Sequence, residues 1–181
     1  MLKQRIIYTS LFFILFIASL LYVFFGKIWT DENWYYSGAV LVSKGLHPFY
    51  DFFSHHNPIY YYVYALPQYF FGPSLIIGRL TSFIFVICIC ILTFILGKKL
   101  GGRYSGLFAL IFLAGNHYTI RFHSMMTYHP LESVFILLFF FFLTTRIKDH
   151  IKYAICTTLL IMTIGVRYPI DISIVYLFLF L

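Results

Sequence analysis

The residues that could do chemistry are concentrated between Thr30 and Pro58. This segment holds three of the six acidic residues, Asp31, Glu32 and Asp51, and three of the seven histidines. A carboxylate can remove the proton of an acceptor hydroxyl as that hydroxyl attacks, and a cationic group can stabilise a departing phosphate. The segment therefore predicts proton transfer or phosphate recognition, provided that the rest of the chain brings it to a suitable substrate.

The rest of the chain is strongly apolar. It has 181 residues, of which 61% are hydrophobic and 10% are charged. A soluble domain cannot bury so much apolar surface, so the composition predicts a membrane protein. The net charge of +7 does not indicate nucleic-acid binding, because the basic residues fall at the ends of apolar runs. The three cysteines lie inside apolar runs and lack the spacing of a redox or zinc site.

Five apolar runs are predicted to cross the membrane, which takes about 20 apolar residues per crossing. A sixth begins near Ile170, and because the chain stops inside this run we expect it to be truncated at its C-terminus. The first run is longer than the core of a signal peptide and continues into FFGKIW, so we interpret it as a transmembrane helix. The five predicted spans are residues 6–25, 75–96, 104–120, 131–145 and 153–166.

The Tyr-rich residues 58–73 are predicted to form a helix at the membrane boundary, because the piece is short and is interrupted by Pro67. With this piece outside, the basic KKLGGR loop falls on the cytoplasmic side with the N-terminus, as short basic loops do. The first outer loop then covers residues 26–74. We expect an all-α, polytopic protein of the plasma membrane with about five to six transmembrane helices and amphipathic interfacial helices in this loop.

The first of these interfacial helices is predicted to run from Thr30, as its N-cap, to Gly45. Asp31 and Glu32 in its first turn have two interpretations. Acidic side chains complement the positive end of a helix dipole. They also follow the first span directly, where a water-soluble acceptor and a lipid headgroup can meet, and a carboxylate at that place can act as a base.

Several short motifs follow one another in a defined order from this helix onward. They are Asp31-Glu32, Tyr35 or Tyr36 with Ala39, Gly45 to Asp51, His56-Asn57-Pro58, Tyr61-Tyr62, and Phe71-Gly72 with Arg79-Leu80. This order resembles the first outer loop of the glycosyltransferase C superfamily, in the branch of dolichyl-phosphate-mannose protein mannosyltransferases and bacterial aminoarabinose transferases. The resemblance implies sugar transfer from a polyprenyl-phosphate donor to a protein or lipid acceptor on the outer face, without a cofactor.

The resemblance also implies roles for individual residues. Asp31 stands at the position of the family's proposed catalytic base, and Glu32 is the adjacent acid of the same motif. His56 falls where the aminoarabinose branch has a lysine that contacts the lipid phosphate, but an imidazole carries its charge only in part near neutral pH. Arg79 matches the arginine that opens the next span. Arg167 matches a basic-x-Pro element at the outer end of a later span.

The resemblance also implies a second acidic position after the second outer loop, in RFHSMMTYHPLES. Glu132 is the acid available there, although another register places His129 at this position. Glu132 could instead complement a helix dipole. Arg79 and Arg167 could equally be side chains that snorkel to the membrane boundary.

The sequence thus predicts that residues 1–181 are the N-terminal part of a transmembrane glycosyltransferase domain. The rival interpretation is a membrane carrier or assembly subunit for lipid-linked sugars without catalytic activity. No metal site is predicted, because the acids and histidines lack a known ligand spacing. The candidate site residues are Asp31, Glu32 and Glu132 for catalysis, and His56, Arg79, Arg167 and Tyr61 for substrate binding.

Overall fold

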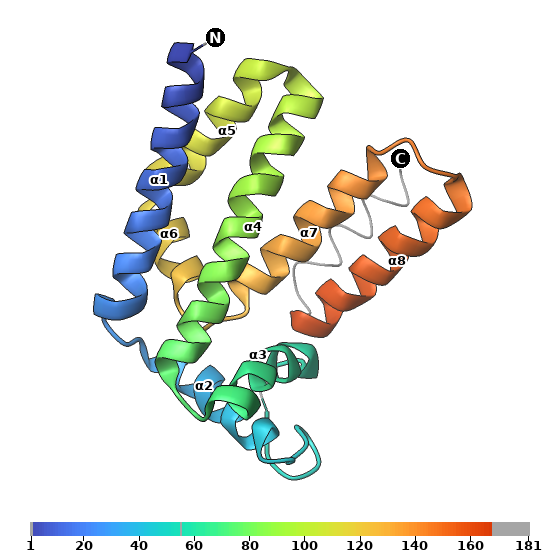
Figure 1. The fold of residues 1–181 in the computed structure, drawn as a ribbon. Coiled ribbons are helices and arrows are strands. Elements are labelled where there is room, and N and C mark those ends of the chain that lie inside the picture. The colour runs from blue at the N-terminus through green and yellow to red at the C-terminus, as the bar shows by residue number, and fades with distance from the viewer. Residues whose placement is uncertain (1, 55, 168–181) are drawn as a thin grey trace.

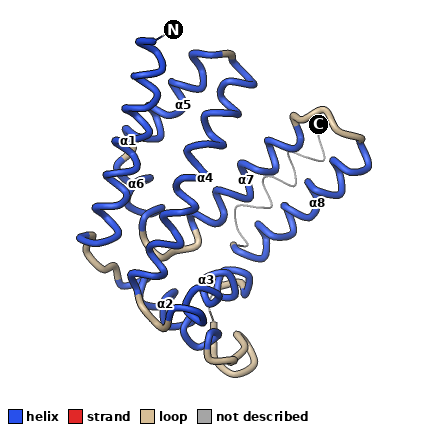
Figure 2. The backbone as a smooth tube through the Cα atoms, viewed as in Figure 1, coloured by secondary structure: helices blue, strands red, loops and turns tan. Residues whose placement is uncertain are grey.

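The computed structural model describes residues 2–54 and 56–167, and these residues form eight helices joined by short loops (Figures 1 and 2). No strand occurs in this part of the chain, so the predicted all-α class is confirmed. The predicted span near Ile170 lies outside the described residues. The helices are α1 (Leu2–Phe25), α2 (Thr30–Ser43), α3 (Pro58–Phe71), α4 (Leu75–Gly101), α5 (Arg103–Gly115), α6 (His117–Ser124), α7 (His129–Leu143) and α8 (Asp149–Val166).

Helix α4 is the longest helix and lies at the centre of the fold (Figure 1). It packs against α1, α5 and α7, and α8 packs against α7 as an antiparallel hairpin. Helices α2 and α3 lie across one end of this bundle, where α1 and α8 end and α4 begins (Figure 1). This end is called the loop end below. The functional residues predicted between Thr30 and Pro58 are all placed there.

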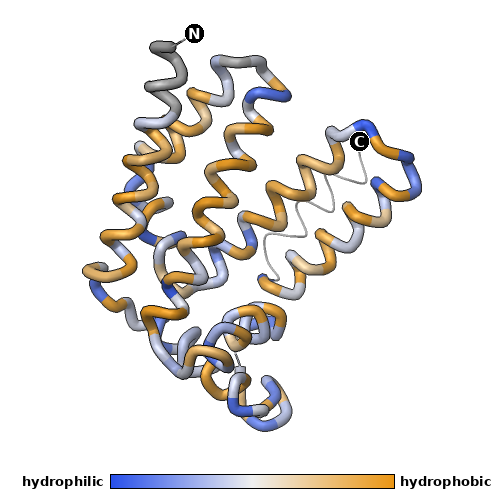
Figure 3. The backbone as a smooth tube through the Cα atoms, viewed as in Figure 1, coloured by the Kyte–Doolittle hydropathy of each residue, from blue (hydrophilic) through white to orange (hydrophobic). Residues whose placement is uncertain are grey.

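Two of the described helices, α4 and α8, are each long and apolar enough to cross a membrane. Two further helix pairs pass the same test of length and composition together. They are the bent pairs α1 with α2, at 79°, and α6 with α7, at 107°. Large apolar side chains such as Phe13, Ile84 and Ile161 point outward from the bundle (Figure 3 shows the apolar residues along its helices). The described residues therefore contain two to four candidate spans, which is compatible with a membrane protein.

One predicted span is divided in the structure. Residues 104–120 were expected as a single crossing, but α5 ends at Gly115 and α6 begins at His117. Between them, the side chain of Asn116 accepts a hydrogen bond from the backbone N–H of Thr119, 3.2 Å away, and so caps α6. An Asn side chain favours such a cap over a helix interior. Alone, α5 has 13 residues, about 20 Å at the usual helical rise, which is less than the bilayer core.

The two helices of the first outer loop form as predicted, with one difference in capping. Thr30 is the first helical residue of α2, and Trp29 holds the N-cap position without a side-chain hydrogen bond. The expectation that Thr30 caps the helix is therefore wrong. At the other end, Gly45 has a φ of 89°, a left-handed conformation that suits glycine after a helix. Helix α3 includes Pro67, and its place at the membrane boundary stays a prediction.

The end of the bundle opposite the loop end is basic. Lys98 and Lys99 lie in the last turn of α4, and the connection between α7 and α8 is also strongly hydrophilic (Figure 3). The ammonium of Lys99 donates a hydrogen bond of 3.0 Å to the hydroxyl of Thr145, which links these two connections. By the positive-inside rule, this end is expected to face the cytoplasm and the loop end is expected to face outward.

This orientation can be tested by labelling. In a protein whose native Cys88, Cys90 and Cys156 are replaced, we expect Tyr50→Cys to react with a membrane-impermeant maleimide on intact cells. Leu100→Cys should react only after permeabilisation. Both positions are well exposed, at 89% and 72%, so reactivity reports the side of the membrane and not burial. Labelling of Leu100→Cys alone on intact cells would show the reverse orientation.

Candidate functional site

Glu32 and Arg79 form a buried ion pair at the loop end. Nε of Arg79 donates to Oε1 of Glu32 over 2.7 Å, and Nη2 donates to Oε2 over 2.6 Å. Glu32 is fully buried and Arg79 is 4% exposed. This two-point geometry, in which a planar guanidinium faces a carboxylate, is the strongest arrangement for such a pair.

The remaining polar contacts of the pair come from the backbone. Nη1 of Arg79 donates to the carbonyls of Val23, at 3.2 Å, and Gly26, at 2.9 Å, at the end of α1. Oε1 of Glu32 also accepts the backbone N–H of Met126 over 3.0 Å. The pair thus joins four segments, which are the end of α1, α2, α4 and the connection between α6 and α7. Arg79 is held toward the protein interior, and a direct contact with a donor phosphate stays a prediction.

Asp31 has the opposite environment although it is the neighbour of Glu32. It is exposed and lines a cavity of about 610 Å³ at the loop end. Consecutive residues of an α-helix project about 100° apart, so one acid of the pair can face inward while the other faces outward. The cavity is bounded by α2, by the loop before α3, by Tyr61 at the start of α3, and by Tyr128.

Aromatic rings form much of the wall of this cavity. The rings of Tyr35 and His56 lie 4.6 Å apart between centroids, and Tyr128 lies 5.5 Å from Tyr35 and 5.8 Å from His56. Burial, with smaller contributions from Tyr128 and Asp31, raises the pKa of Tyr35 far above its ordinary value. Its phenol is therefore neutral at any physiological pH. Flat rings beside a carboxylate suit a ligand that has both C–H faces and hydroxyl groups.

Close packing of α2 against α3 fixes this wall. A Cβ atom added at Gly38 would lie 2.2 Å from the ring of Tyr61, so only glycine allows this approach. Behind Tyr61, the hydroxyl of Tyr64 lies 2.8 Å from Oγ of Ser82 and 3.1 Å from the carbonyl of Thr127. Helix α3, which supplies Tyr61 to the cavity, is therefore tied to α4 and to the connection between α6 and α7.

Arg167 adds a positive charge beside the cavity. Its guanidinium lies 4.7 Å from the centroid of the Tyr128 ring, as in a cation–π contact. The end of α8 is brought here by α3, because the amide of Asn57 donates to the carbonyl of Ile164. Glu132 lies close by in the first turn of α7, where it is 4% exposed and its backbone N–H donates to the carbonyl of Tyr128. Glu132 does not line the cavity.

The structure therefore separates the predicted site residues into groups. Asp31, His56 and Tyr61 line one cavity, and Arg167 lies next to it. Glu32 and Arg79 form the buried pair, and Glu132 is buried near Tyr128. Tyr128 was missed by the sequence analysis, although it joins the wall to Arg167; it precedes His129-Pro130 in a segment without a recognisable motif. Within the described residues, no group of three or more Asp, Glu, His or Cys residues could hold a metal ion.

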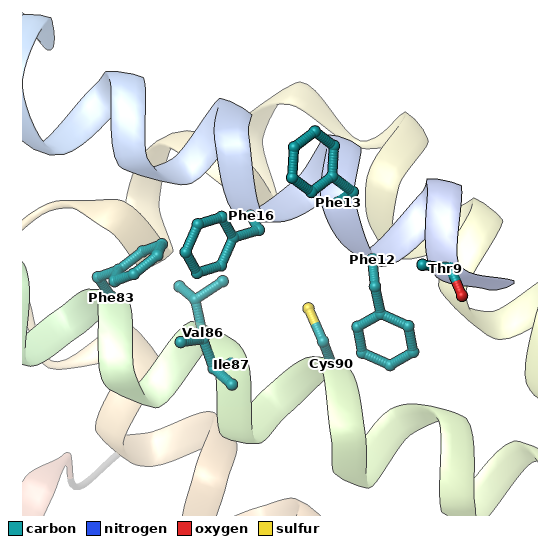
Figure 4. Close-up of a pocket in the computed structure, with 8 residues that line it drawn as sticks. All are labelled: Thr9, Phe12, Phe13, Phe16, Phe83, Val86, Ile87 and Cys90. Carbon is teal, nitrogen blue, oxygen red and sulfur yellow. The ribbon is translucent and has the colours of Figure 1, made fainter.

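A second cavity, of about 400 Å³, lies between α1 and α4 but offers no chemistry (Figure 4). Phe12 and Phe16 of α1 and Phe83 and Val86 of α4 point toward it, and its lining is almost entirely apolar. Such a surface suits the hydrocarbon chain of a lipid. The cavity with Asp31 is therefore the candidate site.

Comparison of the chain with protein-family models, with curated proteins and with solved structures finds no match.

The buried pair gives a stability prediction. Glu32→Gln leaves the Arg79 guanidinium buried without a counter-charge, and we expect the free energy of unfolding to fall by about 3–5 kcal/mol. The measurement is the denaturation midpoint of the purified protein in detergent. The matched control is Asp149→Asn, which breaks the ion pair of Asp149 with Lys152, 2.9 Å apart at the surface, and should hardly change the midpoint. Equal midpoints for Glu32→Gln and the parent would contradict the structural role of the pair.

Proposed function

We propose that the chain is part of a membrane glycosyltransferase that transfers a sugar from a polyprenyl-phosphate donor to a protein or lipid acceptor. The observation that supports this most directly is the cavity of about 610 Å³ lined by Asp31, His56 and Tyr61. It combines an exposed carboxylate, a titratable ring and aromatic walls, with the guanidinium of Arg167 beside it. A base, a phosphate partner and a sugar platform are the groups that this reaction needs.

In the proposed reaction, the carboxylate of Asp31 accepts the proton of an acceptor hydroxyl. The acceptor oxygen forms a bond to the anomeric carbon of the sugar, and the bond from that carbon to the phosphate oxygen breaks. The phosphate leaves with the electron pair, and attack from the opposite face inverts the configuration at the anomeric carbon. Arg167 and the protonated form of His56 stabilise the charge on the departing phosphate.

The other predicted residues have supporting places in this proposal. Glu32 is a positioning residue, because its pairing with Arg79 fixes the turn of α2 from which Asp31 projects. With Arg79 held in that pair, the candidates for the donor phosphate are His56, which lines the cavity, and Arg167, which lies beside it. Burial and, to a smaller extent, the carboxylate of Glu132 raise the pKa of the Tyr128 phenol. Glu132 is buried in the first turn of α7, and it stays the candidate second acid of the proposed site.

The proposed location is the outer face of the plasma membrane. The chain crosses the bilayer about five to six times, with a cytoplasmic N-terminus and residues 26–74 as the first outer loop. In this arrangement the cavity lies where α1 leaves the bilayer and α4 enters it. A polyprenyl-phosphate sugar presents its phosphate and anomeric carbon at the same depth, so the donor and the carboxylate of Asp31 can meet.

The first test separates catalysis from simple binding. We expect Asp31→Asn to lower kcat by roughly 10²- to 10⁴-fold, the usual contribution of a general base, while donor binding is retained. The measurement is transfer of a radiolabelled sugar from a polyprenyl-phosphate donor in membranes, together with donor binding by the same protein.

The control for this test is Asp51→Asn, in the same outer loop. Oδ2 of Asp51 accepts the backbone N–H of His47 over 2.7 Å, a bond that an asparagine carbonyl can still accept. This variant should retain activity. Full turnover by Asp31→Asn would refute the transferase proposal and favour a carrier or assembly subunit that only binds the lipid-linked sugar.

The second test concerns the phosphate. His56→Lys places a permanent positive charge beside the cavity, and a lysine stands at the matching position of the aminoarabinose branch. We expect the variant to bind the donor more tightly near neutral pH, measured as a several-fold lower KM for the donor at unchanged acceptor KM. His56→Gln, which cannot carry a charge, should raise the donor KM. The reverse pattern, with a higher donor KM for His56→Lys and a lower donor KM for His56→Gln, would place the donor phosphate away from His56.

A further inference from the structure

A separate basic cavity of about 440 Å³ lies at the end of α1. Its polar lining comes from Lys27, just after α1, and from His117 and Arg121 of α6. Its apolar lining comes from the last turns of α1, including Leu21 and Phe25, which are 54% and 82% exposed. No acidic residue is among the described residues that line it, so the cavity combines positive charge with an open apolar surface.

Arg121 is held in this cavity in an unusual way. Its guanidinium lies 4.3 Å from the centroid of the Trp29 ring and 5.8 Å from that of Phe122. A cation over a ring face uses no hydrogen-bond donor. Within residues 2–54 and 56–167, Arg121 makes no ion pair, and its buried Nε has no hydrogen-bond partner. The ring thus fixes a cation whose N–H groups are not used by the described protein.

Arg121 is half-buried, but its buried Nε–H is a charged donor without a partner, which is unfavourable, and an anion with several oxygens would relieve this. Arg79 makes the contrast clear, because its donors are taken by Glu32 and by two carbonyls. A free phosphate ion would not use the exposed apolar side of the cavity. A phosphate ester with hydrocarbon chains would use both sides, with its head at Lys27 and Arg121 and its chains along Leu21 and Phe25.

We propose that this cavity binds the headgroup of an anionic glycerophospholipid, with its phosphate between Lys27 and Arg121 and its acyl chains along the end of α1. A guanidinium and an ammonium at the end of an apolar helix can donate charge-assisted hydrogen bonds to a lipid phosphate. The site is distinct from the cavity with Asp31 and requires no catalytic activity.

The chain has two tryptophans, Trp29 and Trp34, whose intrinsic fluorescence can report lipid binding. Trp29 stacks on Arg121, whereas Trp34 lines the cavity with Asp31. With Trp34→Phe, fluorescence reports on Trp29 alone. The full chain is placed in phosphatidylcholine vesicles that contain a minor proportion of acyl-brominated phosphatidylglycerol or of acyl-brominated phosphatidylcholine. We expect stronger quenching by brominated phosphatidylglycerol, and no such preference in the Trp29→Phe control, which reports on Trp34.

Two substitutions assign the preference to the cavity. Arg121→Gln and Lys27→Gln should each reduce the ratio of the quenching by brominated phosphatidylglycerol to the quenching by brominated phosphatidylcholine. The expected loss of affinity for the anionic lipid is about fivefold, which corresponds to about 1 kcal/mol. Arg121→Lys should retain most of the ratio. Lys27 is exposed, so its substitution removes charge without removing a packed side chain and keeps the test valid if an Arg121 variant fails to fold.

Three outcomes would overturn the proposal. The first is equal quenching of Trp29 by the two lipids, or an unchanged ratio in both the Arg121→Gln and the Lys27→Gln proteins. The second is loss of the preference on addition of millimolar inorganic phosphate, which would show a site for the free ion. The third is displacement of brominated phosphatidylglycerol by an equal amount of polyprenyl phosphate, which would identify the carrier lipid as the ligand. Any of these results could occur with the transferase proposal intact.

Discussion

The loop end of this protein depends on one buried ion pair, between Glu32 and Arg79. Removing two charges from water carries a large desolvation penalty, which is offset only when the pair has good geometry and its remaining donors are satisfied. Both conditions are met here, because the two side chains share two hydrogen bonds and the backbone of two connections supplies further partners. Since four segments meet at this pair, none can shift without breaking a hydrogen bond to a buried charged group.

The same pair sets the position of both candidate binding regions. The carbonyl of Gly26 accepts a hydrogen bond from Arg79. Residues 26–29 connect α1 to α2, and Asp31 lies in the first turn of α2. Gly26 and Lys27 line the basic cavity, Trp29 stacks on Arg121 of that cavity, and Asp31 lines the other. The connection is short, so its anchoring by Arg79 limits the movement of both sites together. Arg79 therefore affects both sites through its position inside the protein, without contacting a substrate.

The helices could largely be predicted from the sequence, whereas the pairing of residues could not. Apolar runs bounded by glycine and charge located α1, α4, α7 and α8, because helix formation depends on local composition. The break at Asn116 depends on a single side chain that favours a cap within an apolar run. The pairing of Glu32 with Arg79, 47 residues apart, and the place of Tyr128 result from tertiary packing, which leaves no local signal. The resemblance assigned the base to Asp31 and a supporting role to Glu32, but the burial of Glu32 and the exposure of Asp31 follow only from the packing of α2.

The difference between these two acids also accounts for their types. The inner acid must reach both Nε and Nη2 of Arg79 and still accept the N–H of Met126, from a helix whose backbone is held by close packing at Gly38. Aspartate is shorter by one carbon–carbon bond, about 1.5 Å, and would lose this two-point contact. The outer acid has no such partner to reach, and a short side chain keeps its carboxylate close to the helix and limits its conformational freedom. The longer Glu32 thus serves the structural position, and the shorter Asp31 serves the solvent-facing one. The helix dipole alone does not explain this order, because it favours either acid at either place.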